Sequence, residues 1–122
     1  MKNAINWFEI PVVDLDRAKK FYQEIFAAEF YDFKMPGFKM FGFPCDQDGV
    51  GGAICLAEGM VPSKTGVIVY LNGGDDLSII LNRVEAAGGS IVVPKTQITP
   101  EIGYFAHFID SEGNLLALHS MN

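Results

Sequence analysis

The chain has 122 residues and a mass of 13.4 kDa, the size of one domain that buries about two-thirds of its unfolded surface. Fifteen acidic and nine basic residues give a net charge of −6 and a pI near 4.7, which argues against nucleic acid as a partner. The apolar stretches are too short to cross a bilayer and Cys45 and Cys55 form no disulfide framework, so we expect a cytoplasmic protein with reduced thiols.

The first half of the chain predicts a strand, a helix and three further strands. Residues 4–13 are rich in aromatic and branched side chains, which is typical of a strand. Asp14 is placed to cap a helix from residue 15 to about residue 27, whose apolar positions share one face and must pack on a sheet. Turn-forming residues separate three more predicted strands, at residues 29–34, 38–43 and 52–57.

A connector at residues 58–65 leads into a second series of the same elements. Residues 66–72 predict a strand, and Asp75 or Asp76 is expected to cap the second helix. Gly88-Gly89 ends that helix by allowing the left-handed backbone that a helix C-terminus commonly needs. Three strands follow, at residues 90–94, 104–110 and 114–120, the last two joined by a short hairpin turn.

The two halves are related by a constant offset. An offset of 62 residues aligns Asp14-Leu15 with Asp76-Leu77, and Gly51 and Leu56 with Gly113 and Leu118. The chain is therefore interpreted as a single domain made of two similar units, about residues 1–60 and 64–122. Two small half-sheets related in this way tend to enclose a cavity, and that cavity is where we expect the functional site.

The ends of the chain resemble those of the vicinal oxygen chelate proteins, the superfamily of glyoxalase I, bleomycin-resistance proteins, fosfomycin-resistance proteins and extradiol dioxygenases. The resemblance covers essentially the whole chain and implies an α+β fold of tandem βαβββ units, with two four-stranded half-sheets around a cavity. This superfamily hosts lyases, dioxygenases, transferases and simple binders, so the fold leaves the chemistry open. The matching residues are Glu9-Ile10-Pro11-Val12, Asp14-Leu15, Arg17-Ala18, Phe21-Tyr22, Gly103-Tyr104-Phe105-Ala106 and Asp110-Ser111-Glu112-Gly113-Asn114.

The resemblance also implies where a metal would be held, because enzymes of the superfamily bind a divalent ion through His, Gln or Glu on two strands of each unit. The corresponding positions here are Trp7, Cys55, Ala117 and one residue within 67–69. Only Cys55 has a side chain that binds metals, and a lone buried thiol is more often inert packing than a ligand. We therefore expect no metal cofactor at this place.

A displaced metal site remains an alternative. Glu9 follows Trp7 by two residues and His119 follows Ala117 by two, so strand alternation directs both toward the face of the missing ligands. His107 lies on the neighbouring predicted strand. Each histidine also has a structural interpretation, and Glu9, on an otherwise apolar strand, either contacts a ligand or pairs with Arg17 or a lysine.

Aromatic residues make up 12% of the chain, and most of them must be core. Phe33, Phe38, Phe41 and Phe43 crowd the first unit, whereas others are predicted to border the cavity. No catalytic residue is identified from the sequence. The predicted ligand-binding residues are Trp7, Glu9, Cys55, Tyr70, Phe105, His107 and His119.

The favoured function is metal-independent binding of a small, partly aromatic or cationic molecule, similar to a bleomycin-resistance protein. The alternative is an enzyme, either a glyoxalase-like lyase or dioxygenase-related protein with a displaced metal, or a metal-free catalyst that uses Glu9 and His119 as acid and base. The exposed edges of two open half-sheets predict a homodimer. We expect neither nucleic acid nor a membrane as a partner.

Overall fold

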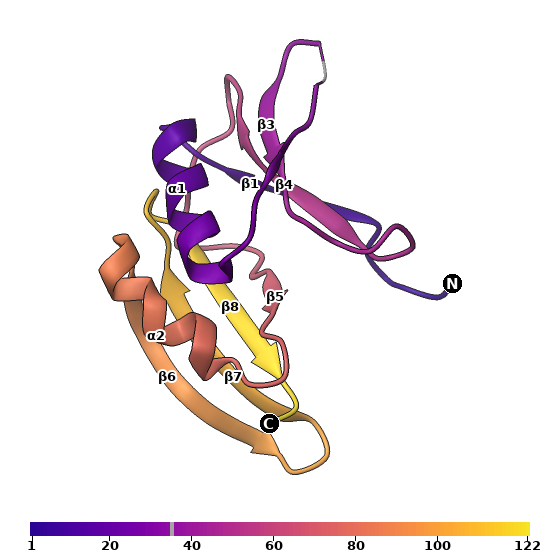
Figure 1. Ribbon diagram of the computed structural model, residues 1–122, viewed down its shortest axis with the longest axis vertical. Helices are drawn as coiled ribbons and strands as arrows, with labels where there is room; N and C mark the ends of the chain where they lie inside the picture. Colours follow the sequence, from indigo (N-terminus) through magenta and orange to yellow (C-terminus); the bar gives the residue numbers. More distant parts are fainter. Residues whose placement is uncertain (35) are drawn as a thin grey trace.

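The computed structural model describes residues 1–34 and 36–122, and contains two four-stranded sheets and two helices (Figure 1). The α+β fold expected from the sequence is confirmed. Neither helix in the described residues is long and apolar enough to cross a membrane. The elements are β1 Trp7–Pro11, α1 Leu15–Phe26, β2 Tyr31–Asp32, β3 Lys39–Gly42, β4 Gly51–Leu56, β5 Tyr70–Asn72, α2 Ser78–Ala87, β6 Ser90–Thr99, β7 Gly103–Ile109 and β8 Leu115–Ser120.

Both sheets have the same strand order, which reflects the repeat seen in the sequence. The first sheet is ordered β1-β4-β3-β2 and the second β5-β8-β7-β6. The first strand of each unit runs parallel to the last strand of that unit, while the remaining pairs are antiparallel. Each unit therefore places its first and last strands side by side, and these strands carry the predicted site residues other than Phe105 and His107, which lie on the adjoining β7.

Helix α1 begins and ends close to the predicted residues. The Asp14 side chain accepts a hydrogen bond from the Arg17 N–H at 3.0 Å, which satisfies one of the free donors of the first turn. The helix ends at Phe26, and the C-cap residue Ala27 that follows has a φ of 50°, in the left-handed region. An alanine in that conformation is strained, because its Cβ crowds the backbone where glycine has none.

The N-cap residue of helix α2 is Leu77, which makes no side-chain capping bond, whereas the sequence predicted Asp75 or Asp76; Asp76 directly precedes it. Asp76 Oδ1 accepts from the Ser78 N–H at 2.9 Å and also from Lys95 Nζ at 2.9 Å. These bonds lower the pKa of Asp76 to about 2, chiefly through Lys95. Gly88 has a φ of 110° at the C-terminus, as the glycine pair predicts.

One hydrophobic core lies between the helix-facing sides of both sheets. The two helices pack on each other, and Figure 1 shows them side by side against the sheets. The opposite side of each sheet lies away from this shared core. The core side chains include Ile10, Val12 and Ile54 from the first sheet, Phe21, Tyr22 and Val84 from the helices, and Leu71, Phe108 and Leu118 from the second sheet.

A buried polar network joins the closing hairpin of the second unit to the start of α1. Glu112 Oε1 accepts from the N–H groups of Val13 and Asp14 at 2.9 and 2.8 Å. Arg17 Nε donates to Glu112 Oε2 at 2.7 Å, and the Tyr22 hydroxyl donates to Asp110 Oδ2 at 2.7 Å. These contacts fix how the two units sit on each other.

Four strands differ from their predicted bounds by two residues or more, among them β1, which spans Trp7–Pro11 where residues 4–13 were predicted. Strand β2 has two residues, and β5 begins at Tyr70 although residues 66–72 were predicted. Strand β6 continues past Pro94 to Thr99, where the sequence predicted an end. Proline is tolerated there because β6 is an edge strand and its pairing with β7 shifts register between Val93 and Thr96, so no ladder donor is required.

Candidate functional site

The first group of predicted site residues lies on the side of the first sheet away from the core, which we call the first-sheet face. Strand alternation places Trp7 and Glu9 on this side, opposite Ile10. Trp7 Nε1 donates to Glu9 Oε2 at 3.3 Å, and the tryptophan is 37% exposed. The first-sheet face comprises Trp7, Glu9, Tyr31, Phe33, Met40, Gly42, Ala53 and Cys55.

Cys55 lies fully buried in the floor of the first-sheet face, packed with Met40 and Ala53. Burial raises the pKa of the Cys55 thiol, and the negative charge of Glu9 raises it further. The thiolate is the form that binds metals and attacks electrophiles, so these surroundings oppose both roles. Cys55 serves here as part of an apolar floor.

Glu9 does not pair with Arg17, which was one of the two interpretations from the sequence. Arg17 instead forms its ion pair with Glu112, at 2.7 Å. Within residues 1–34 and 36–122, no lysine, arginine or histidine lies within ion-pair distance of Glu9. The carboxylate is exposed, and among the described residues its side-chain hydrogen bond is the long one from Trp7.

The second group lies on the corresponding side of the second sheet, which we call the second-sheet face. Tyr70 is the register partner of Ala117, and Ala117 is also the partner of His107. The Tyr70 hydroxyl is 3.5 Å from His107 Nε2, and the Phe105 ring centroid is 5.4 Å from that of His107. These three aromatic side chains therefore form one cluster beside Ala117.

His119 is the register partner of Phe105, at the edge of the same cluster. Its Nε2 lies 2.6 Å from the carbonyl oxygen of Ile102. We assign the proton to Nε2, because the carbonyl can only accept. That nitrogen is engaged with the backbone, which leaves Nδ1 as the free ring nitrogen.

The residues present do not fit the divalent metal that the superfamily resemblance implies. Trp7 pairs with Gly51 whereas Cys55 pairs with Pro11, at the opposite end of the same ladder, so these two positions do not face each other. Ala117 lies beside aromatic residues and offers no lone pair. In the described part of the chain, no three His, Cys, Asp or Glu side chains are grouped to hold an ion.

The predicted cavity residues thus form two groups, and a single chain does not bring them together. Among the described residues, no hydrogen bond or aromatic contact joins the first-sheet face to the second-sheet face. An open cleft of about 880 Å³ separates the units, and Tyr70 alone of the predicted residues lines it. The expectation that the half-sheets enclose a cavity lined by all these residues stays a prediction, and it would need a second copy of the chain, because the shared core lies between the two faces of one chain.

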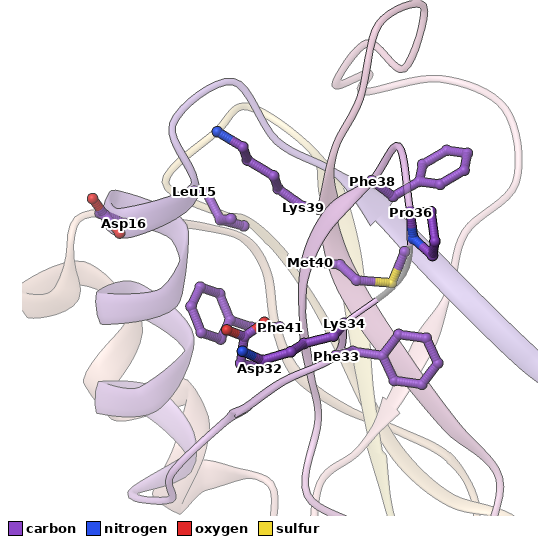
Figure 2. A pocket seen from close by; sticks show the side chains of 10 residues that line it. All are labelled: Leu15, Asp16, Asp32, Phe33, Lys34, Pro36, Phe38, Lys39, Met40 and Phe41. Atoms are coloured by element: carbon purple, nitrogen blue, oxygen red, sulfur yellow. The ribbon is translucent and has the colours of Figure 1, made fainter.

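A second hollow lies beside the hairpin of β2 and β3 and has a volume of about 560 Å³ (Figure 2). Figure 2 shows Phe33 and Phe38 on one side of the hairpin, and Leu15 and Asp16 of α1 on the other. None of the predicted ligand-binding residues lines this hollow. It does include Phe33 and Met40, which belong also to the first-sheet face.

Two aromatic residues of the first-sheet face, Tyr31 and Phe33, were not predicted as site residues from the sequence. Tyr31 and Phe33 alternate within the predicted strand 29–34, so the period-two pattern could have placed them on one side. The Phe33 ring centroid lies 5.4 Å from that of Trp7 and 6.2 Å from that of Tyr31. Sequence reasoning assigned the phenylalanines of this region to the core instead.

Comparison with known proteins gives one consistent family. The family model described as "Glyoxalase/Bleomycin resistance protein/Dioxygenase superfamily" matches residues 4–118. A "Glyoxylase-like domain-containing protein" from Didymella fabae is 32% identical over 126 residues, which covers 97% of this chain and 94% of that relative.

Solved structures of this family have the same fold at low identity. A glyoxalase-related enzyme from Fulvimarina pelagi matches with a TM-score of 0.67 at 17% identity, and the match covers 98% of this chain and 88% of the enzyme's chain. TnmS3, an antibiotic binding protein from Streptomyces sp. CB03234, has a TM-score of 0.62 at 22% identity and covers 97% of this chain and 95% of its own.

Proposed function

The chain belongs to the Glyoxalase/Bleomycin resistance protein/Dioxygenase superfamily, and on that premise we propose that it binds a small, partly aromatic or cationic molecule without a metal ion and without transforming it. The observation that carries the proposal is the replacement of metal ligands by Trp7, Ala117 and a buried, protonated thiol at Cys55. Aromatic rings and one carboxylate occupy the faces where a reacting metal would otherwise lie.

The side chains on these faces suit recognition better than catalysis. Trp7 and Phe33 offer apolar ring surfaces for stacking, and Glu9 offers an acceptor without a cationic partner among the described residues. On the second-sheet face, Tyr70, Phe105 and His107 add a further aromatic cluster. TnmS3, an antibiotic binding protein of the same fold, supports a binding function.

A homodimer would complete the site. The first-sheet face carries a carboxylate, which accepts hydrogen bonds, and the second-sheet face carries two histidines, whose ring N–H groups donate them, so the two faces offer complementary hydrogen-bonding groups. A twofold axis would set the first-sheet face of one protomer against the second-sheet face of its partner and form two equal cavities. Exposed apolar side chains beside the second-sheet face support this pairing, among them Val67 at 91%, Tyr70 at 53% and Ile102 at 51%.

The proposed setting is the cytoplasm, because both cysteines are free thiols and such thiols persist in reducing compartments. The net charge of −6 disfavours a nucleic-acid partner.

The proposal is tested by a thermal-shift screen of aromatic, cationic and thiol-conjugate compounds, run with EDTA and again with added divalent ions. A compound at a hundred times its Kd stabilises the folded protein by about 2.7 kcal/mol, and we expect an equal shift with and without EDTA. Glu9→Gln should weaken the binding of that compound. Glu24 is an exposed carboxylate on α1, and Glu24→Gln should leave the affinity for the compound unchanged. A stabilisation that requires the metal would refute the proposal.

The second candidate function is a glyoxalase-like or dioxygenase-related enzyme with a displaced metal site. It is favoured by the placement of His107 and His119 on adjacent strands of one face, with Glu9 available from a second copy. The engagement of His119 Nε2 with Ile102 counts against it. Near-stoichiometric Ni, Zn, Mn or Fe in purified protein, lost in His119→Ala, would favour this enzyme over the binding protein.

A further inference from the structure

We propose that Tyr31 and Phe33 join Trp7 and Glu9 to form a subsite for an alkylated ammonium group, an inference that rests on the proposed binding function and specifies the chemistry of its ligand. The three rings form one row on the first-sheet face. Trp7 and Phe33 are inclined by 39° with centroids 5.4 Å apart, and Tyr31 and Phe33 by 55° with centroids 6.2 Å apart.

The row exists because small side chains form its floor. Trp7 lies on β1 and Tyr31 on β2, which are the opposite edges of the sheet, about three strand spacings or about 14 Å apart. Rings from these edges meet only if the strands between them carry little bulk. Gly42 and Ala53 supply that floor, and a Cβ added to Gly42 would overlap the Tyr31 ring.

The carboxylate of Glu9 lies at one end of this row. Its Oε2 accepts the 3.3 Å hydrogen bond from the Trp7 indole. Within residues 1–34 and 36–122, no hydrogen-bond donor contacts Oε1. The nearby lysines do not neutralise it, since Lys39 alternates with Met40 and points to the side of α1, as Figure 2 shows. The face therefore combines three π-surfaces with one negative charge.

An alkylated ammonium ion fits this combination better than a neutral or an anionic group. Aromatic faces attract cations electrostatically, and desolvated contacts of this kind contribute most. A neutral ligand would gain the stacking but would cover the Glu9 carboxylate without compensating its charge. An anion would be repelled by it, and a guanidinium would need more hydrogen-bond acceptors than Glu9 provides.

The apolar floor explains the preference for alkyl groups on the nitrogen. Met40, Ala53 and Cys55 are buried beneath the row and offer carbon and protonated sulfur. Because these three side chains are fully covered, they offer a ligand no hydrogen-bond acceptor, and the alkyl groups of an ammonium ion would pack on the rings above them, while primary N–H groups would lose their hydrogen bonds to water. The chemistry thus favours a trimethylammonium or similar centre.

The test uses Trp7, the sole tryptophan of the chain, as its reporter. Trp7 fluorescence is titrated with choline and with its neutral isostere, in which a tert-butyl group replaces the trimethylammonium group. We expect a saturable response to choline and an affinity at least about tenfold above that of the isostere, the factor expected for a cation over desolvated rings. Equal affinities, or no saturable response to choline, would overturn the subsite.

Variants separate the roles of charge and rings. Glu9→Gln should reduce the preference for choline over the isostere. Tyr31→Leu and Phe33→Leu should each lower the affinity for choline severalfold. Phe38→Leu is the matched control, because Phe38 lies on the same hairpin and is 41% exposed but stands outside the row; its choline affinity should not change. Gly42→Ala tests the row without changing a ring, since the added Cβ should displace the Tyr31 ring and lower the affinity for choline while the fold persists.

The outcomes distinguish this inference from the proposed function. A protein that binds compounds from the screen but shows no preference for choline over its isostere contradicts the subsite and leaves the binding function standing. A protein that is stabilised only by compounds together with a metal contradicts the binding function, whatever its response to choline.

Discussion

Glu112 connects the two units more directly than any other single residue on the polar network. Its side chain is fully buried, and it accepts hydrogen bonds from two backbone N–H groups of the first unit, from Arg17 and from Ser111. Burial alone would raise the pKa of the Glu112 carboxyl, but these hydrogen bonds outweigh it and the net shift is downward.

We predict that Glu112→Gln lowers the free energy of unfolding by about 2 to 3 kcal/mol, because hydrogen bonds to a buried charged group contribute about 1.5 to 3 kcal/mol. Urea denaturation measures this loss. Glu24→Gln on the exposed face of α1 is the matched control and should change stability little. A loss in Glu112→Gln no larger than that of the control would refute the role assigned to this residue.

The same residue predicts a pH dependence. Since the pKa of Glu112 is lower in the folded protein, its ionised form stabilises the fold above the ordinary glutamate value of about 4.3, and this stabilisation is lost as the pH falls through the folded-state pKa. We expect stability to decline as the pH falls below about 5, and to decline less in Glu112→Gln. In that variant, part of the remaining decline of stability with falling pH comes from Asp76, whose pKa is lowered to about 2.

The residues of this network show what one sequence can predict at this scale. The hairpin turn at residues 110–114 was predicted from local turn chemistry. Its hydrogen bonds to Val13, Asp14 and Arg17 were not, because partners so far apart in the chain leave no periodic signal. The same reason explains why the sequence offered Arg17 as a partner for Glu9.

Among the elements, the helices were predicted more closely than the strands. Both helices carry an apolar stripe and an aspartate near the first turn, which are local signals: Asp14 caps α1, and Asp76 accepts from the Ser78 N–H just before α2. Helix α1 ends at Phe26 where about residue 27 was predicted. Strand bounds depend on pairing, and pairing is set by residues elsewhere in the chain. Hence β6 extends through Pro94 on a sheet edge, against the local preference of proline.

The end of α1 offers a stabilising substitution. We predict that Ala27→Gly raises the free energy of unfolding by up to about 1 kcal/mol, because it relieves the left-handed strain of a non-glycine residue. Ala28→Gly is the matched control: Ala28 does not have a positive φ, so glycine there should be neutral or destabilising. Thermal unfolding of the two variants compares them directly, and an increase of equal size in both would contradict the explanation.

At the scale of the whole molecule, the repeat and the fold were predictable, but the relation between the two faces was not. Strand alternation placed Glu9 on the face of Trp7 and His119 on the face of Ala117, as the structure has them. The cavity expected between the half-sheets stays a prediction, because the structure turns the helix-facing sides of both sheets toward one core and leaves the predicted site residues on the other sides. The distribution of apolar residues between a core and an interface is not encoded in periodicity.

We predict that the protein in solution has twice the mass of the 13.4 kDa chain. Tyr70→Glu should shift it toward the single chain, because this change places a charge within the proposed interface beside His107. Light scattering coupled to size-exclusion chromatography measures both. Glu24→Lys, which changes charge on α1 away from that face, should remain dimeric. A purely monomeric wild type would contradict the composite cavity.

The central claim is that this chain binds its ligand without a metal ion, and calorimetric titration of the purified, chelator-treated protein with Ni²⁺ and Zn²⁺ tests it most directly. We predict no stoichiometric heat, because the positions that would supply ligands are Trp7, Cys55, Ala117 and an aliphatic residue within 67–69. Tight binding of one ion per chain that is abolished in Glu9→Gln or His119→Ala would contradict the claim.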